Sequence, residues 1–253
     1  MNTKGIVALF NEEKIPVYGI TQALKMADEE SGYRPEDLLP SSKSMICFGL
    51  PVPRSIYDES DYSPSAIWRT QNLLYRKLDT ISLRLSILLE EMGEKSLPIY
   101  GCMPLHINKE NIIDGVFNQL RMAEVAGMGV IGKNGLLIHS KYGSRLMIGG
   151  LLTTATLHET HYPEINEPGC PPECRICSDA CPVDAIDPEN RQVDIMRCLS
   201  YSAQIPLMSK LKFVLMRARD RKEAARYMNI TTHDELTFHI CSKCVSICPY
   251  GKV

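Results

Sequence analysis

The chain has 253 residues, of which 44% are hydrophobic and 23% are charged, and its formal net charge is −2 at pH 7. This length allows one large and one small domain, and the small net charge excludes a general electrostatic attraction to nucleic acid or to an anionic membrane. The N-terminus lacks the apolar core of a signal peptide, and no stretch approaches the roughly 18 apolar residues of a membrane span. The sequence therefore predicts a cytoplasmic protein with no membrane partner.

Short apolar runs predict buried strands in the first part of the chain. Three of them lie at 17–21, 44–50 and 97–103. Two further strands, 135–140 and 145–155, flank the turn residues 141–144 and are expected to pair as a hairpin.

Two helices are expected between these strands. Ser63 and Pro64 suit a helix N-terminus, and apolar residues then recur at steps of four and three up to Met92, just before Gly93. Residues 111–126 predict a second helix, which Gly127 would end. Because helices and strands mix without βαβ repeats, residues 1–160 are predicted to form an α+β domain.

A domain boundary is expected within 158–172, where prolines and polar residues gather. Residues 161–253 are then predicted to form a small second domain. Within it, residues 209–228 predict one helix with an excess of Lys and Arg. This helix suits an acidic partner protein, and the alternative is an ordinary solvated face.

The cysteines are concentrated in the predicted second domain, and only Cys47 and Cys102 of the ten lie before it. Disulfides are not expected in the cytoplasm, where thiols are kept reduced. The other eight form two runs that end in Cys-x2-Cys-x3-Cys-Pro, with one isolated cysteine between them: Cys170, Cys174, Cys177 and Cys181, then Cys198, then Cys241, Cys244 and Cys248.

This spacing is typical of two-cluster ferredoxins, in which the fourth cysteine of each run binds the cluster of the other run. On that pattern, cluster one takes Cys170, Cys174, Cys177 and Cys248, and cluster two takes Cys181, Cys198, Cys241 and Cys244. Zinc is the alternative, because Cys-x2-Cys pairs also bind zinc. Zinc ribbons do not need interleaved ligands or the Cys-Pro tail, so the sequence favours two 4Fe-4S clusters that carry single electrons.

A glycine motif, Gly127-x-Gly129-x-x-Gly132-Lys133, matches the dinucleotide-binding fingerprint as text. That fingerprint binds a pyrophosphate only when it follows a strand and opens a helix. Here a helical stretch precedes it and an apolar run follows, so a nicotinamide site is not expected. The motif predicts a helix end and a tight turn, or a bare backbone that lies against a flat cofactor.

Several segments together resemble the superfamily of epoxyqueuosine reductases and reductive dehalogenases. The resemblance spans nearly the whole chain and is carried by residues 37–40, 44–50, 121–134, 136–138, 142–144, 149–152 and 197–201, together with the cysteine runs. It implies a nitroreductase-like domain at 1–160 that binds cobalamin, and a ferredoxin-type domain at 161–253 whose two 4Fe-4S clusters feed electrons to cobalt. It also implies that one group of residues lies near the corrin: Gly132, Lys133, Asn134, Tyr142, Gly143, Ser144 and Gly149.

The chain departs from the epoxyqueuosine reductases at three places. Gly101 stands where those enzymes carry an aspartate proton donor, and a glycine cannot act as a general acid. Cys102 beside it is the candidate catalytic residue, although core packing is the more ordinary role for a lone cysteine. The C-terminal helical-repeat extension that binds tRNA is not matched, so a nucleic-acid partner is not expected. The segment between Cys198 and Cys241 is longer than in those enzymes.

Three functions follow from the resemblance. The first is a cobalamin-dependent iron–sulfur oxidoreductase, supplied by an electron donor such as a ferredoxin or a flavodoxin. The second is an electron-transfer or corrinoid-handling protein that reduces the corrinoid of a partner protein. The third is a flavin-dependent reductase, because nitroreductase-like domains often carry a flavin.

Overall fold

The computed structural model describes residues 3–57, 63–100, 105–107, 113–160, 169–204, 207–231, 238–239 and 241–251. Its α-helices are α1 (Lys4–Glu12), α2 (Pro35–Leu38), α3 (Ser63–Glu91), α4 (Gln119–Val125), α5 (Ile176–Asp179), α6 (Ile195–Ser202), α7 (Leu207–Arg219), α8 (Arg221–Thr231) and α9 (Lys243–Ser246). Two 3-10 turns are η1 (Ala23–Met26) and η2 (Arg54–Tyr57). The strands are β1 (Val17–Gln22), β2 (Ser44–Pro51), β3 (Ser96–Ile99), β4 (Leu105–Ile107), β5 (Ile113–Gly115), β6 (Val130–Ile131), β7 (Leu137–Ile138), β8 (Leu146–Thr153), β9 (Ile186–Asp187), β10 (Gln192–Val193), β11 (Ala203–Gln204) and β12 (Phe238–His239).

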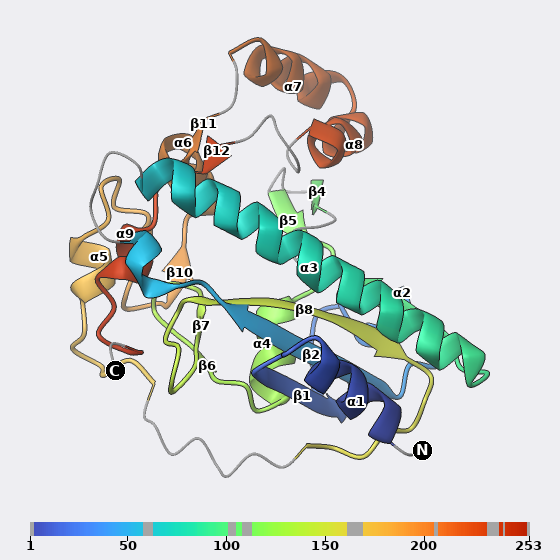
Figure 1. Cartoon of the computed structure of the whole chain (residues 1–253). Helices are drawn as coiled ribbons and strands as arrows, with labels where there is room; N and C mark the ends of the chain where they lie inside the picture. The colour runs from blue at the N-terminus through green and yellow to red at the C-terminus, as the bar shows by residue number, and fades with distance from the viewer. Residues whose placement is uncertain are drawn as a thin grey trace.

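A four-stranded antiparallel sheet, in the order β1-β2-β8-β3, forms the centre of the first domain. Successive side chains of β2 point to opposite faces, as the period of a strand requires. Ile46 and Phe48 pack with α1 and α3, whereas Met45 and Cys47 pack with α4. Helices thus cover both faces of the sheet (Figure 1), and the predicted α+β class is confirmed.

The long helix α3 confirms the apolar stripe expected from the sequence. Leu78, Ile81, Leu85 and Leu89 are almost fully buried against the sheet and α1. Each such side chain contributes roughly 1.5–3 kcal/mol through burial. Gly93, at a φ of 82°, follows the helix end, in the left-handed conformation that glycine adopts without strain.

Two elements of the first domain differ from the prediction. The helix expected at 111–126 is limited to α4, because Asn118 caps its N-terminus by accepting a hydrogen bond from the Arg121 N–H at 3.1 Å. Residues 113–115 are instead the strand β5, paired with β4. The hairpin expected between 135–140 and 145–155 is limited to a single antiparallel bridge between His139 and Gly143 at its turn. Strand β7 pairs with β6, while β8 is paired on both sides by β2 and β3.

The helix expected at 209–228 is two helices, α7 and α8, which break at Asp220. The Asp220 carboxylate accepts hydrogen bonds from the backbone N–H groups of Lys222 at 2.8 Å and Glu223 at 3.3 Å. An aspartate in this position caps a new helix and ends the previous one.

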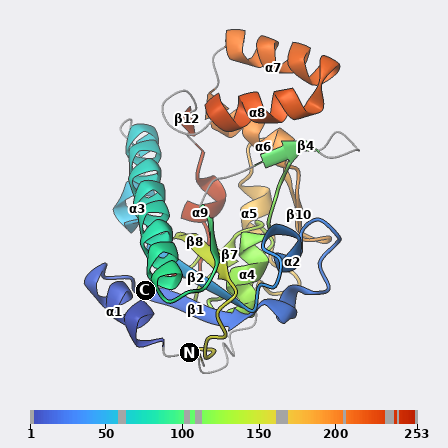
Figure 2. The ribbon, with the colours of Figure 1, turned by 90° about the vertical axis from the view of Figure 1, so that its right-hand side faces the viewer.

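The cysteine-bearing part of the chain lies at one end of the first domain. Helix α5 packs against α9 there, and the α7–α8 pair projects beyond them (Figures 1 and 2). The expected boundary at 161 begins the segment 161–168, which lies outside the described residues. Within the described ranges, no helix has the length and apolar character that crossing a membrane requires.

Candidate metal centre

Three stretches of chain bring the eight cysteines together. Cys177 lies in α5, Cys198 in α6 and Cys244 in α9, and the other five lie in the loops beside these helices. All eight are free thiols. These short helices and the loops beside them carry all eight thiols.

The electrostatic coupling between the thiols defines a first group. Burial raises the pKa of Cys177, and repulsion from Cys170 and Cys174 raises it further. Burial also raises the pKa of Cys248, with added repulsion from the same two thiols. Cys170, Cys174, Cys177 and Cys248 are therefore neighbours, and we call them group one.

The remaining four thiols form group two. Burial raises the pKa of Cys198, and repulsion from Cys241 and Cys181 adds to it. Burial raises the pKa of Cys244 to about 12, followed by repulsion from Cys198 and Cys241. Cys177 of group one also acts on Cys244, so the two groups adjoin.

Groups one and two have the same members as the interleaved ligand sets that the sequence predicts for cluster one and cluster two. Burial that raises a thiol pKa disfavours the bare thiolate, and a metal centre that binds the sulfur stabilises the deprotonated form. Within the described residues, no three His, Cys, Asp or Glu side chains converge closely enough to hold a single ion. A 4Fe-4S cluster binds its four cysteines through different irons, so its sulfur ligands are spaced more widely than those of a single ion.

Lys133 links group one to the first domain. Its backbone N–H points to the Cys170 sulfur at 3.4 Å. Its ammonium donates to the carbonyl oxygens of Pro172 and of Cys174, the second at 3.1 Å. The side chain is only 4% exposed. One buried cation therefore holds the loop that carries two thiols of group one.

The turn at 142–144 packs against the end of the cysteine run. Gly143 has a φ of 56°, and a Cβ atom added there would collide with the Tyr250 carbonyl. The Arg145 guanidinium donates to the carbonyl oxygens of Val52 at 2.7 Å and Gly251 at 3.2 Å. These contacts fix residues 250–251, and with them the neighbouring Cys248, on the first domain.

Ser144 lies at the same contact. Its buried hydroxyl has no hydrogen-bond partner among the described residues. It lies close enough to Cys248 to lower the pKa of that thiol, against the larger effect of burial. A hydroxyl beside a thiol is suited to stabilise the thiolate.

The glycines and Asn134 of the predicted corrin-contacting set contact protein. A Cβ atom on Gly132 would collide with Ile138, and one on Gly149 would approach Leu78 of α3 within 3.2 Å. The buried Asn134 accepts a hydrogen bond from the Leu136 N–H at 3.2 Å. Close packing of the chain on itself thus explains why these two positions are glycines. Contact of these residues with cobalamin stays a prediction.

Other candidates are placed as follows. The segment 101–104, with Gly101 and the candidate catalytic residue Cys102, lies outside the described residues. Cys47 is fully buried in the core between the sheet and α4, and burial raises its pKa. The glycine motif begins at the end of α4 with Gly127 at a φ of 76°, which confirms the helix end expected there.

Tyr57 was not predicted from the sequence. It ends η2, is buried, and lies near both Arg145 and Cys244. Burial raises its pKa to about 12, Arg145 lowers it and Cys244 raises it. No local motif marks this residue, because its neighbours come from distant parts of the chain.

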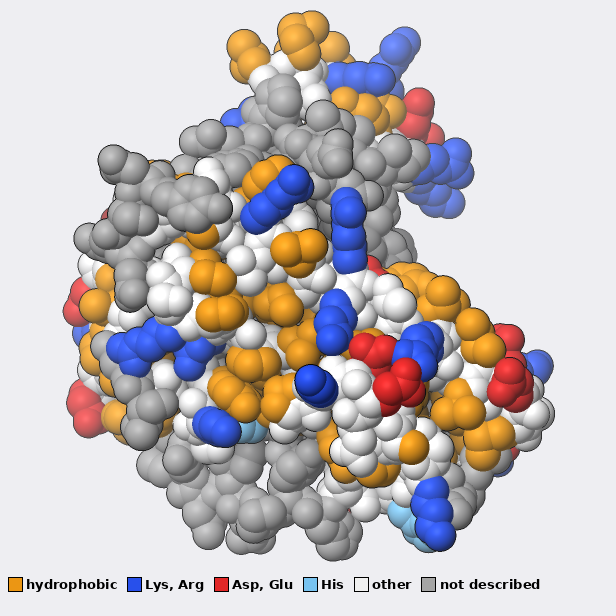
Figure 3. All heavy atoms as spheres, in the orientation of Figure 1, with side chains coloured by type: hydrophobic (Ala, Val, Ile, Leu, Met, Phe, Trp, Pro, Cys, Tyr) orange, Lys and Arg blue, Asp and Glu red, His pale blue; other side chains and the backbone are white. Residues whose placement is uncertain are grey.

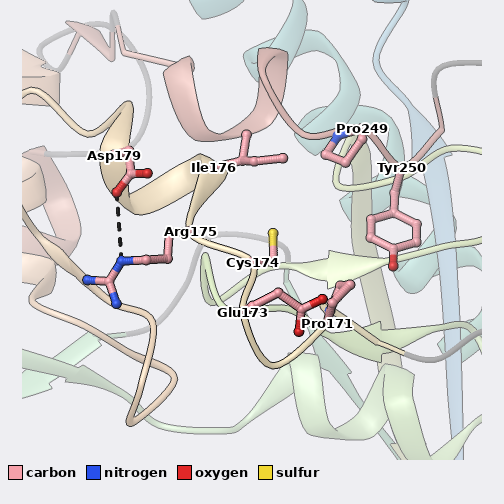
Figure 4. A pocket seen from close by; sticks show the side chains of 8 residues that line it. All are labelled: Pro171, Glu173, Cys174, Arg175, Ile176, Asp179, Pro249 and Tyr250. Atoms are coloured by element: carbon pink, nitrogen blue, oxygen red, sulfur yellow. Dashed lines mark ion pairs between the residues drawn. The ribbon is translucent and has the colours of Figure 1, made fainter.

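A cavity of about 690 Å³ opens beside group one (Figure 4). Cys174 faces it, together with Pro171, Ile176, Pro249 and Tyr250. Arg175 and Asp179 form an ion pair of 3.9 Å at its edge. The cavity brings solvent to one side of group one, while Lys133 and Ile138 cover another side.

Comparison with known proteins agrees with this geometry. Residues 170–251 match the family of 4Fe-4S double cluster binding domains. The epoxyqueuosine reductase of Lactococcus garvieae is 25% identical over 244 residues, which are 92% of this chain and 59% of the relative. That of Gloeobacter violaceus is 34% identical over 137 residues, 54% of this chain and 37% of the relative. The chain thus spans only part of the length of these curated relatives.

Solved structures share the fold. The epoxyqueuosine reductase of Streptococcus thermophilus superposes with a TM-score of 0.59 at 19% identity, over 100% of this chain and 67% of that one. A catabolic reductive dehalogenase also gives a TM-score of 0.59, at 13% identity, over 90% of this chain and 36% of that one. With the double-cluster match at 170–251, these comparisons show a chain that is similar in sequence and fold to epoxyqueuosine reductases and similar in fold to a reductive dehalogenase.

Proposed function

We propose that the chain is an iron–sulfur oxidoreductase that passes single electrons through two 4Fe-4S clusters to a cobalamin. The double-cluster match and the epoxyqueuosine reductase relatives support the iron–sulfur reductase part. One solved structure with this fold, at 13% identity and a TM-score of 0.52, is described as suggesting a mechanism for B12-dependent dehalogenation. Neither the family match nor these relatives supports the flavin alternative.

The observation that carries the proposal is the pair of adjoining thiol groups, one of which is held on the first domain. Group one would bind cluster one and group two cluster two, and each cluster accepts one electron at a time. Cys177 and Cys244 lie where the groups adjoin. An electron that reaches cluster one is then beside Lys133, Ile138 and the 142–144 turn.

The three glycines that the resemblance places near a corrin do not themselves face open space. At Gly132, Gly143 and Gly149 the neighbouring space holds protein atoms. Arrival of the electron at cluster one is therefore the last step that these residues support. The corrin, when bound, would supply a metal that reacts with the substrate after reduction.

Metal analysis of the anaerobically purified protein tests this function. After growth with added cobalamin, we expect about eight irons and one cobalt per chain, with the absorption of iron–sulfur clusters and a corrinoid. About eight irons without cobalt would contradict the cobalamin part and leave an electron carrier. Zinc in place of iron would contradict the whole proposal.

Lys133→Met is expected to make cluster one harder to reduce. The buried ammonium stabilises the electron that a reduced cluster gains, and charge is one of the factors that set cluster potentials. A unit charge roughly 10 Å away contributes about 1.7 kcal/mol at an effective dielectric constant near 20. The one-electron equilibrium should therefore shift at least about tenfold, or roughly 59 mV, in a redox titration followed by electron paramagnetic resonance.

Lys141→Met is the matched control for that measurement. Lys141 lies in the nearby turn but is exposed, with its ammonium 5.3 Å from the Tyr142 ring centre. Solvent screens an exposed charge, so its removal should shift the potential far less. Equal shifts in the two variants would show that the buried position of Lys133 has no special effect on cluster one.

A further inference from the structure

Helix α7 presents an apolar stripe to solvent. None of its residues is buried, and Leu207 and Met208 are 79% and 73% exposed. The exposed apolar residues recur at the spacing of one helix face: Leu207, Met208, Leu211, Val214 and Leu215. A stripe of this kind normally faces a protein core, so on a projecting helix it indicates a surface that another molecule covers.

The stripe borders a cleft between α7 and α8. The cleft measures about 480 Å³ and is lined by Leu211, Leu215, Met216 and Tyr227, among others. Lys212 lies over the Tyr227 ring at 4.7 Å from its centre. A hollow with apolar walls receives a protruding side chain of a protein, whereas a bilayer would favour a flat or convex apolar face.

Positive charges lie on both helices, and Lys212 and Arg219 line the cleft itself. Lys210, Lys212 and Arg219 on α7 and Lys222 and Arg226 on α8 are all exposed. The two acidic residues of the pair are Asp220 and Glu223, and Asp220 caps α8. Figure 3 shows Lys and Arg side chains next to hydrophobic ones at this end of the molecule. The chemistry of the surface therefore suits a partner with an acidic rim and an apolar centre.

The position of the pair connects it with group two. The ribbon of β11 and β12 forms its base. Cys198 lies in α6, directly before β11, and Cys241 lies two residues after β12. The helices are thus inserted between two thiols of the same group, and a protein bound to them would lie on the cluster-two side of the molecule.

We propose that the α7–α8 pair is the docking site for an acidic one-electron carrier protein that reduces cluster two. This inference rests on the proposed function, because it needs both clusters. The reduced carrier gives one electron to cluster two. The carrier is thereby oxidised by one electron and cluster two is reduced by one electron, and no bond forms or breaks. The electron then moves to cluster one, which is packed on the first domain. The surface thus sets the point of electron entry.

The test compares two double variants of the cluster-loaded protein. Lys212→Glu/Arg219→Glu reverses two charges that line the cleft, and Lys14→Glu/Lys95→Glu makes the same change in net charge elsewhere. Lys14 follows α1, which Figure 1 places at the opposite end of the molecule from α7, and Lys95 precedes β3. Reduction by a reduced flavodoxin is followed by stopped-flow absorption at several salt concentrations. Leu211→Gln/Leu215→Gln is measured in parallel to test the apolar part.

At low salt, the cleft variant should be reduced at least tenfold more slowly than wild type, and the control less than twofold more slowly. The wild-type rate should fall as salt rises, because salt screens charge steering, and the leucine variant should be slow at every salt concentration. Equal rates in the two charge variants would overturn the docking site. A second result would also overturn it. If the wild type binds phosphatidylserine vesicles, the cleft variant does not, and the two are reduced by flavodoxin at the same rate, then the surface binds a membrane and not a carrier protein. Dithionite reduces the clusters without docking, so failure of dithionite reduction would instead overturn the proposed function.

Discussion

Replacing Cys181 with alanine is expected to lower the iron content from about eight to about four per chain, because it removes a ligand of one cluster only. Cys47→Ala is the matched control. Cys47 is buried in the sheet core, away from both thiol groups, so this variant should keep about eight irons. The measurement is iron analysis together with the intensity of the cluster absorption.

Double variants distinguish interleaved ligands from contiguous ones. If group two binds one cluster, Cys181→Ala/Cys244→Ala removes two ligands of the same cluster, and about four irons should remain. Cys177→Ala/Cys181→Ala removes one ligand from each cluster, and almost no iron should remain. The reverse result would mean that each run binds its own cluster, and it would contradict the grouping that the structure shows.

Gly143→Ala is expected to loosen the contact between the first domain and the cysteine-bearing part. A φ of 56° costs alanine roughly 1–2 kcal/mol, and the added Cβ must push away the Tyr250 backbone, which costs roughly 1–3 kcal/mol more. At about 2–4 °C per kcal/mol for a chain of this size, the apparent melting temperature should fall by roughly 5–15 °C. Circular dichroism of the cluster-loaded protein at one heating rate measures it.

Gly93→Ala isolates the effect of the collision. Gly93 has a φ of 82°, but no atom lies within 4 Å of an added Cβ. Its replacement therefore carries the backbone strain without the clash, and the fall in melting temperature should be about half as large. Because residue 250 neighbours Cys248, only Gly143→Ala should also release iron faster to a chelator. Equal behaviour of the two variants would show that the contact at Gly143 does not support cluster one.

Local signals explain why much of the fold could be predicted. The buried strand β2 and the stripe of α3 follow from the period of side chains along one element, and the structure has both. The cysteine runs could be recognised because a cluster takes several of its ligands from one short loop, so these ligands lie close together in the sequence. The grouping of Cys248 with Cys170 could be anticipated only because the ferredoxin pattern carries it.

Pairing and long-range contacts account for the rest. The turn at 141–144 predicted a hairpin, but β8 is buried at nearly every residue and has a strand on each side, so it was not free to pair with β7. Asp220 is a strong helix-capping residue, and this signal could have divided the helix expected at 209–228. The hydrogen bond of Lys133 with Pro172 and the electrostatic effect of Cys244 on Tyr57 join residues far apart in sequence. No local pattern contains them.

The interleaving of the two thiol groups also constrains the order in which the protein can mature. Cys170, Cys174 and Cys177 leave the ribosome about seventy residues before Cys248, the fourth member of their group. Cys181 is likewise synthesised about sixty residues before Cys241 and Cys244, which belong to its group. Neither cluster can therefore be completed while the chain is half made, and the two closures must occur almost together. We expect cluster insertion to follow synthesis of the α7–α8 segment, whose extra length adds little to the closure entropy because that cost grows only with the logarithm of loop length.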